Sequence, residues 1–235
     1  MRPATHALLA AGALLAGAAL ASAEPRPAVV ELFTSQGCSS CPPADAYLGE
    51  LAQRSDVLAL TYHVQYWDEL GWRDRFGLTA ATDRQRDYAK VLRLSSVYTP
   101  QVVIDGKADF VGSDRRAIGG ALGPQRSGVP VTIAVTDGQV RVDVAGQGHT
   151  GACDVLLVSY LRSAVSSIGR GENAGRTLKE FNVVRSVRSV GRWDGETREY
   201  FARIDSLPAD ATDVAVLVQS AGQATIIGAQ TAALR

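Results

Sequence analysis

The chain has little of what metal sites and disulfide scaffolds are built from. Its 235 residues include three cysteines and three histidines. Three cysteines in so long a chain do not make a disulfide scaffold, and the odd number leaves at least one thiol without a partner. Zinc in structural sites takes four ligands, and Cys153, His63 and His149 show no ligand-like spacing to the other two cysteines. The composition therefore predicts no resident cofactor.

Neither sign of charge is in excess. Basic and acidic residues number 24 each, and leaving out residues 1–23 removes only Arg2, so 23 basic residues face 24 acidic ones and the net charge is −1. This balance argues against nucleic acid or an anionic lipid surface as a partner. The hydrophobic fraction of 46% is ample for a globular core. Nothing in the composition indicates an oligomeric state.

A hydrophobic run long enough to cross a membrane is also missing. The N-terminus carries Arg2, an Ala/Leu/Gly-rich run over residues 7–20, and the small residues Ala21 and Ala23 before Glu24. This is the pattern of a secretory signal peptide over residues 1–23. Because a comfortable transmembrane helix needs about 20 apolar residues, we expect no stable membrane insertion and a periplasmic or secreted protein.

Residues 24–123 alternate between strand-like and helix-like segments. Strands are expected at 28–35 and 56–64, and helices at 42–55 and 82–94. A hairpin turning at Asp105-Gly106 and a closing helix follow. The order β-α-β-α-β-β-α predicts an α/β domain in which helices cover a sheet.

The helical signal largely stops after the Gly/Pro-punctuated residues 124–130, which we interpret as a linker. Residues 131–235 contain several strand-length segments, beginning with a hairpin at Asp137-Gly138. Strands separated by turn signals in this way predict an all-β, antiparallel, sandwich-like second domain.

The stretch CSSC holds two of the three cysteines at the junction between the first strand and the first helix. A helix N-terminus favours a thiolate, so Cys38 is the candidate nucleophile. Cys41 is then placed to resolve a mixed disulfide. A structural staple is one alternative, although a loop this short yields only about 2 kcal/mol. A Cu(I) site on Cys38 and Cys41 is another, because soft thiolates suit that ion.

Two segments resemble the active-site elements of the thioredoxin and glutaredoxin superfamily. VVELFTSQGCSSCPPAD resembles the strand and cysteine motif, and VYTPQVVIDG resembles the strand that a cis-proline precedes. The resemblance makes Thr99-Pro100 the candidate cis bond, with Pro100 against the cysteines. The alternative is an ordinary trans proline opening an edge strand.

Further motifs, YHVQYWDELGWRDRF, RQRDYAKVL and IGRGENAGRTL, extend the likeness over the whole mature chain. Together with the two segments above, they resemble the secreted family catalogued as domain of unknown function 1223. This resemblance implies a thioredoxin-like N-terminal half and a β-rich C-terminal half. It implies no established substrate.

Several residues around the pair are candidates for supporting roles. The resemblance to thioredoxins makes Glu31 a buried acid that accepts a proton from Cys41; the alternative is a solvent-facing position at a sheet edge. Tyr66 and Trp67, with Thr99, are candidates for a substrate groove beside the cysteines, or else they cover the sheet. The loop over residues 168–178 is expected to contact the first half or a partner.

These features predict an exported thiol-disulfide oxidoreductase acting on protein or low-molecular-weight thiols and disulfides. The competing hypothesis is a non-catalytic binding protein on the same scaffold, carrying copper on the cysteine pair or a protein partner on the β-rich half. His63 is interpreted as a core histidine and Cys153 as a small buried hydrophobic residue.

Overall fold

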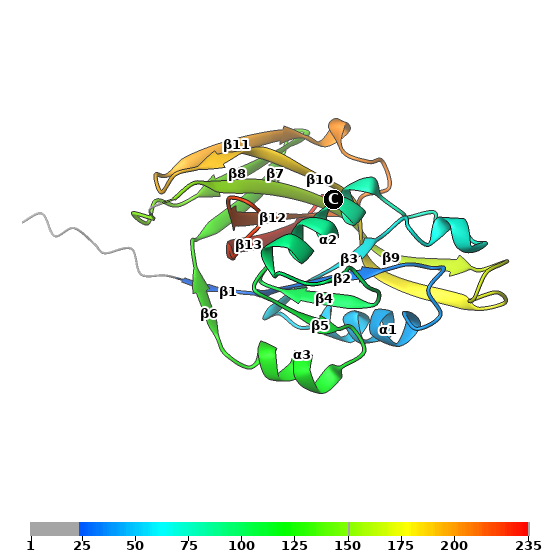
Figure 1. Ribbon diagram of the computed structural model, residues 1–235. Helices are drawn as coiled ribbons and strands as arrows, with labels where there is room; N and C mark the ends of the chain where they lie inside the picture. Colours follow the sequence, from blue (N-terminus) through cyan, green and yellow to red (C-terminus); the bar gives the residue numbers. More distant parts are fainter. Residues whose placement is uncertain (1–23, 150, 235) are drawn as a thin grey trace, which may run out of the picture.

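The computed structural model describes residues 24–149 and 151–234 of the chain. The predicted signal peptide, residues 1–23, lies outside the described residues. Figure 1 shows a mixed α/β molecule, in which a large twisted sheet carries helices at one end and a smaller sheet at the other.

The large sheet combines strands from both halves of the chain in the order β13-β12-β9-β10-β3-β2-β4-β5. The first half supplies β2 (Ala28–Thr34), β3 (Val57–His63), β4 (Gln101–Ile104) and β5 (Ala108–Val111). The second half supplies β9 (Cys153–Ser167), β10 (Thr177–Trp193), β12 (Asp213–Ser220) and β13 (Ile226–Ala233). Every residue of β2 and β3 is buried, as expected for apolar strands in the middle of a sheet.

Helices cover both faces of the first half of the sheet. On one face, Val30 and Leu32 pack against α1 (Pro42–Leu51) and α3 (Arg115–Leu122). On the other face, residues of β2 and β3 pack against α2 (Thr79–Val91). The alternation of side chains along β2 therefore sends neighbouring residues to different helices. Short 3₁₀ turns lie at Asp68–Leu70 and Ile204–Ser206.

A three-stranded antiparallel sheet covers the second half. It consists of β11 (Arg198–Arg203), β8 (Gln139–Val144) and β7 (Val131–Thr136), in that order. Its inward-facing valines share a core with Trp193 and with the apolar residues of β9 and β12. This is a sandwich-like packing of two sheets. Both expected hairpin turns are present, because Asp105-Gly106 and Asp137-Gly138 all have positive φ, as a type I′ turn requires.

The join between the two halves differs from the sequence prediction of two domains and a linker. β10 lies beside β3 as a parallel neighbour, with Val183 opposite Thr61, so strands of both halves share one sheet. The Thr61 hydroxyl donates to the carbonyl of Phe181 at 2.6 Å, and Asn182 Nδ2 donates to the carbonyl of Ala59 at 2.8 Å. The predicted linker contains β6 (Arg126–Gly128), which pairs with β1 (Glu24–Arg26). Sequence periodicity identifies strands but not their neighbours.

The start of α2 is also different from the expected one. The helix begins at Thr79, three residues before the start at residue 82 that the sequence predicts. The Thr82 hydroxyl instead accepts a hydrogen bond from the amide of Gln65 at 3.0 Å, which ties the helix to the segment after β3. The helix therefore starts about one turn earlier than predicted.

Candidate active site

The two cysteines of the CSSC stretch form a disulfide at the start of α1. The Cα atoms of Cys38 and Cys41 are 5.4 Å apart. The amide of Cys41 donates to the carbonyl of Cys38 at 3.2 Å, and Cys41 is the residue that precedes the first turn of the helix. Pro42 and Pro43 occupy the first two helical positions, where a missing N–H costs little. The predicted strand-to-helix placement of the motif is confirmed, with Cys38 one turn before the helix.

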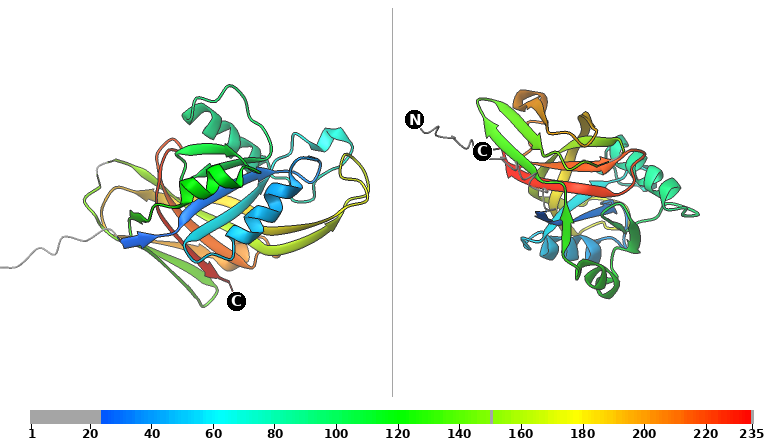
Figure 2. Two further views of the ribbon diagram at one scale, coloured as in Figure 1. Left: turned by 90° about the horizontal axis from the view of Figure 1, so that it is seen from below. Right: turned by 90° about the vertical axis from the view of Figure 1, so that its left-hand side faces the viewer.

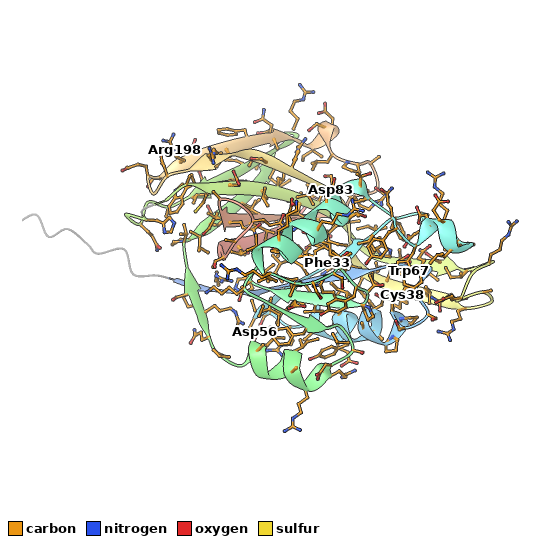
Figure 3. All side chains as sticks on the ribbon, in the orientation of Figure 1. Phe33, Cys38, Asp56, Trp67, Asp83 and Arg198 are labelled. Carbon is orange, nitrogen blue, oxygen red and sulfur yellow. A yellow bond between two sulfur atoms is a disulfide. The ribbon has the colours of Figure 1, made fainter. Side chains whose placement is uncertain are left out.

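Both sulfur-bearing residues are fully buried, whereas Ser39 and Ser40 between them are exposed. Figure 3 shows Cys38 beside Trp67, at the end of the molecule where α1 begins. The Cβ of Trp67 is so close to Gly37 that a Cβ added at Gly37 would lie 3.3 Å from it. Trp67 thus packs against Gly37, directly before the motif.

The tip of the β9–β10 hairpin, residues 168–176, shields one side of the motif. Figure 2 shows this hairpin extending past the sheet toward the segment that follows β3. The buried Asn173 donates through Nδ2 to the carbonyls of Gln36 and Cys38, both at 2.9 Å. The carboxylate of Glu172 accepts from the amide of Ser39 at 3.1 Å. The contact that the sequence predicted between this loop and the first half is present.

The peptide bond between Thr99 and Pro100 is cis, as the resemblance to thioredoxins implied. A Cβ added at Gly112 would lie 2.9 Å from the Cβ of Pro100 and 3.0 Å from the Cβ of Ala44, which places Pro100 near the first turn of α1. Trp67 Nε1 donates to the Thr99 hydroxyl at 2.9 Å. Trp67 therefore contacts both the cysteine loop and the cis-proline loop.

Tyr66 lies next to Trp67 but faces α2. Its hydroxyl donates to Gln85 Oε1 at 3.2 Å, and Gln85 Nε2 donates to the carbonyl of Tyr98 at 2.7 Å. Burial raises the pKa of Tyr66 above its ordinary value. The residues expected to form a substrate groove, Tyr66, Trp67 and Thr99, are thus connected and half-buried beside the motif.

Glu31 is buried, but the structure places it away from the cysteines. Glu31 alternates with Val30 and Leu32, which face α1, and so it points to the opposite face of the sheet. There its carboxylate accepts from Arg84 Nε at 2.6 Å and Arg84 Nη2 at 3.0 Å, and the Tyr88 hydroxyl also donates to it. The solvent-facing alternative is wrong because β2 is a central strand. The geometry also gives no support for Glu31 as the proton acceptor of Cys41, since both of its oxygens are held by α2.

A second group of buried charges lies on the α1 face, close to the cysteine motif. His63 Nδ1 is 2.7 Å from Asp74 Oδ2, which also accepts from the amide of Gln36 at 2.8 Å. The side chain of Gln36 donates to Glu180 Oε1 at 2.7 Å, and that oxygen is 3.9 Å from His63 Nε2. Gln36, two residues before Cys38, thus links the motif to these charges. We call His63, Asp74, Glu180 and the nearby Asp45 the buried acid cluster.

Burial and neighbouring charges shift the pKa values of three residues in this cluster. Burial disfavours a charged imidazole, but Asp74, Glu180 and Asp45 together raise the pKa of His63 to about 9. For Asp74, burial acts in the opposite direction, yet the neighbouring His63 keeps the pKa of this carboxyl below its ordinary value. Burial raises the pKa of Asp45 to about 7, with His63 opposing the shift. At neutral pH the imidazolium of His63 is therefore paired with Asp74.

Sequence reasoning missed most of this cluster. The signal for Asp45 was available, because it follows Cys41 by four residues on an expected helix. Glu180 gave no local signal, since only the pairing of β10 with β3 brings it to the motif. His63 was interpreted as a core histidine, and it is buried with a carboxylate partner.

The described residues contain no helix that is long and apolar enough to span a membrane. Residues 24–149 and 151–234 also contain no group of three or more histidine, cysteine or acidic side chains arranged to hold a metal ion. In this oxidised form both sulfurs of Cys38 and Cys41 are in the disulfide, so the pair presents no thiolate to Cu(I).

The family model described as protein of unknown function (DUF1223) matches residues 29–219. A crystal structure of a protein from Agrobacterium tumefaciens is similar, with 32% identity and a TM-score of 0.78, over 91% of this chain and 97% of that one. HBP35 of Porphyromonas gingivalis has a similar fold, with 14% identity and a TM-score of 0.62, over 89% of this chain and 76% of that one. No curated protein matches the chain. The extent of the family match and the 32% identity show that the chain belongs to the DUF1223 family of proteins of unknown function.

Proposed function

We propose that the chain is an exported thiol-disulfide oxidoreductase with a thioredoxin-like first half. The observation that carries the proposal is the Cys38–Cys41 disulfide at the start of α1, with the cis bond of Thr99-Pro100 near the first turn of the same helix. A disulfide that closes so short a loop adds little stability, which favours a chemical role over a structural one. The signal peptide predicted for residues 1–23 would deliver the protein to a compartment in which disulfides persist.

The proposed reaction is a two-step exchange. In the reduced protein, the thiolate of Cys38 attacks a substrate disulfide, forms a mixed disulfide, and releases one substrate sulfur as a thiolate. Cys41 then loses its proton and attacks the sulfur of Cys38. The bond between Cys38 and the substrate breaks, the second substrate thiolate leaves, and the Cys38–Cys41 disulfide forms. The substrate gains two electrons and the protein loses them, and the reverse sequence oxidises a substrate dithiol.

Access to the disulfide is the main structural demand on this reaction. Cys38 and Cys41 are fully buried, and Trp67 and the tip of the β9–β10 hairpin lie over the loop that carries them. Ser39, whose amide binds Glu172, is the exposed point of the loop. A substrate therefore reaches the Cys38 sulfur when the contacts of Glu172 and Asn173 open.

The burial of both sulfurs also favours a second candidate, a binding protein in which the disulfide is structural. The two candidates differ in the reduction potential of the pair. We expect equilibration of the purified chain in glutathione buffers, with trapping of free thiols, to give a potential between about −270 and −120 mV, the range of exchange catalysts. A value below about −300 mV identifies a structural disulfide and contradicts the proposal.

Replacement of cysteines by serine gives the matched control. Cys38→Ser and Cys41→Ser together are expected to abolish exchange with glutathione disulfide while the circular dichroism spectrum stays unchanged. Cys153→Ser removes the buried thiol that lies outside the pair, and it is expected to leave exchange intact. Copper binding by the reduced wild type that disappears in the double variant would move the assignment to a metal-binding protein.

A further inference from the structure

The space between α1, β2 and β3 contains polar atoms that no described residue satisfies. Thr34 Oγ1, Asp45 Oδ1 and His63 Nε2 are all buried, and none has a hydrogen-bond partner within the described part of the chain. Thr34 and His63 are opposite each other in the β2–β3 register, and the α1 face is the one they share. Asp45, on α1, lies near both of them, because the imidazole of His63 and the Thr34 hydroxyl both lower the pKa of its carboxyl. Native proteins satisfy most buried polar groups, so three unsatisfied atoms at one place call for an explanation.

This place adjoins the resolving cysteine. The amide of Asp45 donates to the carbonyl of Cys41 at 3.1 Å, and Cys41 itself has helical dihedral angles. Residues four apart on a helix lie on the same face, with Cβ atoms about 5–6 Å apart. The Asp45 side chain is therefore on the side of α1 that Cys41 occupies. Cys41 is fully buried, and Asp45 is half-buried with its Oδ1 atom out of contact with solvent.

The groups that face Asp45 come from each element packed around it. The charges of His63 on β3, Asp74 before α2 and Glu180 on β10 all act on the pKa of the Asp45 carboxyl, and the Thr34 hydroxyl on β2 lowers this pKa. The single cation, His63, is shared by three carboxyls. Asp74 holds one imidazole nitrogen, and the other has no hydrogen-bond partner among the residues described. Of the three carboxyls, the one on α1 is four residues from Cys41, on the same side of the helix.

We propose that Asp45 accepts the proton that Cys41 loses when it attacks the mixed disulfide, and that His63 is the positioning residue that stabilises the ionised carboxylate. The inference rests on the proposed function and adds the proton transfer to it. The S–H bond of Cys41 breaks and an O–H bond forms on Asp45. The Cys41 thiolate then bonds to the sulfur of Cys38, and the departing substrate thiolate takes a proton from water. In the reverse direction Asp45 returns its proton to Cys41.

The acid–base balance of the site supports this role. A proton acceptor works best when its pKa is near the working pH. Burial raises the pKa of Asp45 to about 7, so the carboxyl is present in both forms near neutrality. Glu31, the acid expected from the sequence, is engaged by Arg84 and Tyr88 on the other face of the sheet.

The first experiment follows the resolving step directly. The reduced chain is mixed with glutathione disulfide, and release of the second glutathione is recorded across pH by stopped flow. We expect Asp45→Asn to slow this step roughly 100-fold near neutrality, the lower end of general base catalysis, and to remove the inflection near pH 7. His63→Gln is expected to shift that inflection upward, because the imidazolium favours the ionised carboxylate.

Asp83→Asn is the matched control. Asp83 is an exposed carboxylate on α2, and its loss leaves the buried acid cluster untouched. If Asp45→Asn keeps both the rate and the inflection while wild type exchanges disulfides, the assignment of Asp45 is wrong and the proposed function stands. If wild type shows no exchange, the proposed function is wrong, and the proton site is then judged by the second experiment.

The second experiment needs no turnover. Carbon-13 NMR titration of the Asp45 carboxyl is carried out on the oxidised and the reduced chain. Coupling between two titrating groups is reciprocal, so we expect the titration midpoint of Asp45 to move upward on reduction and to stay fixed in a Cys41→Ser variant. Identical midpoints in the oxidised and reduced wild type would overturn the inference, whatever the activity.

Discussion

Two buried charge clusters lie on opposite faces of the same pair of strands, and they differ in how completely their atoms are paired. On the α2 face, Glu31, Arg84 and Tyr88 bond to one another and to Gln219, and only the hydroxyl of the neighbouring Tyr62 lacks a partner in the described chain. On the α1 face, the buried acid cluster leaves oxygen and nitrogen atoms of Asp45 and His63 without partners in the described chain. Paired buried charges rigidify a fold, whereas a buried titratable group without a partner costs free energy. The comparison is consistent with a structural role for the first cluster and with the proton transfer proposed for the second.

The largest effect is expected from breaking the ion pair of Glu31 and Arg84 on the α2 face. Arg84→Met leaves the carboxylate of Glu31 buried without a counter-ion, and this should cost about 3–5 kcal/mol of unfolding free energy in urea titrations. The double variant Glu31→Leu with Arg84→Met removes both charges and should recover most of the loss. A cost below about 1 kcal/mol for the single variant would show that this cluster does not stabilise the fold.

A smaller, pH-dependent effect is expected from the incompletely paired cluster. The pKa of His63 is raised from an ordinary value of 6.5 to about 9, so its contribution to stability is fully present below pH 6.5 and is lost as pH rises toward 9. The raised pKa of Asp45 acts in the same direction between 3.8 and about 7. Urea titrations should show stability falling by up to about 3 kcal/mol from pH 6.5 to 9.

His63→Gln is expected to flatten this fall, because no imidazolium remains to be deprotonated. Arg84→Met, in contrast, should keep the pH dependence of wild type at its lower overall stability. If His63→Gln retained the full dependence between pH 6.5 and 9, another group would be responsible for it.

The contrast between buried and exposed groups can be tested again at the hairpin tip. Asn173 is buried and donates two hydrogen bonds to the cysteine loop. If each bond contributes about 1 kcal/mol, Asn173→Ala should speed reduction of the disulfide by dithiothreitol roughly 10- to 30-fold. An unchanged reduction rate would mean that the tip does not limit access to the sulfurs.

The smallest effect is expected at Glu172. Its carboxylate contacts the Ser39 amide from an exposed position, where solvent competes for the same hydrogen bond. Glu172→Ala should therefore change the reduction rate by less than about twofold in the same assay. A change as large as that of Asn173→Ala would show that this exposed contact also limits access of dithiothreitol to the disulfide.

The features that could be predicted from the sequence are those set by neighbouring residues. Pro42 and Pro43 predict a helix start after Cys41, because proline is tolerated in the first turn. The two Asp-Gly pairs predict tight turns, because both residues adopt the positive φ that a type I′ turn requires. The cis bond at Pro100 came from a resemblance, not from the local sequence. The sequence did not predict the face of the sheet toward which Glu31 points, because neighbouring residues of a strand point to opposite faces.

The rest of the site depends on contacts between distant segments. Glu180 and Asn173 lie more than 100 residues from the cysteine motif in sequence, and the β9–β10 hairpin brings both to it. Strand periodicity predicted that hairpin as part of a separate sandwich, since it carries no information about β3 as a neighbour.

The shared sheet also limits how the chain can be divided. β3 is buried at every position, with β2 along one edge and β10 along the other. A fragment that ended after residue 123 would turn this apolar strand into an open edge with unpaired backbone groups. Such an edge is a template for intermolecular strand pairing. By pairing with β3, strand β10 of the second half therefore protects the first half from aggregation.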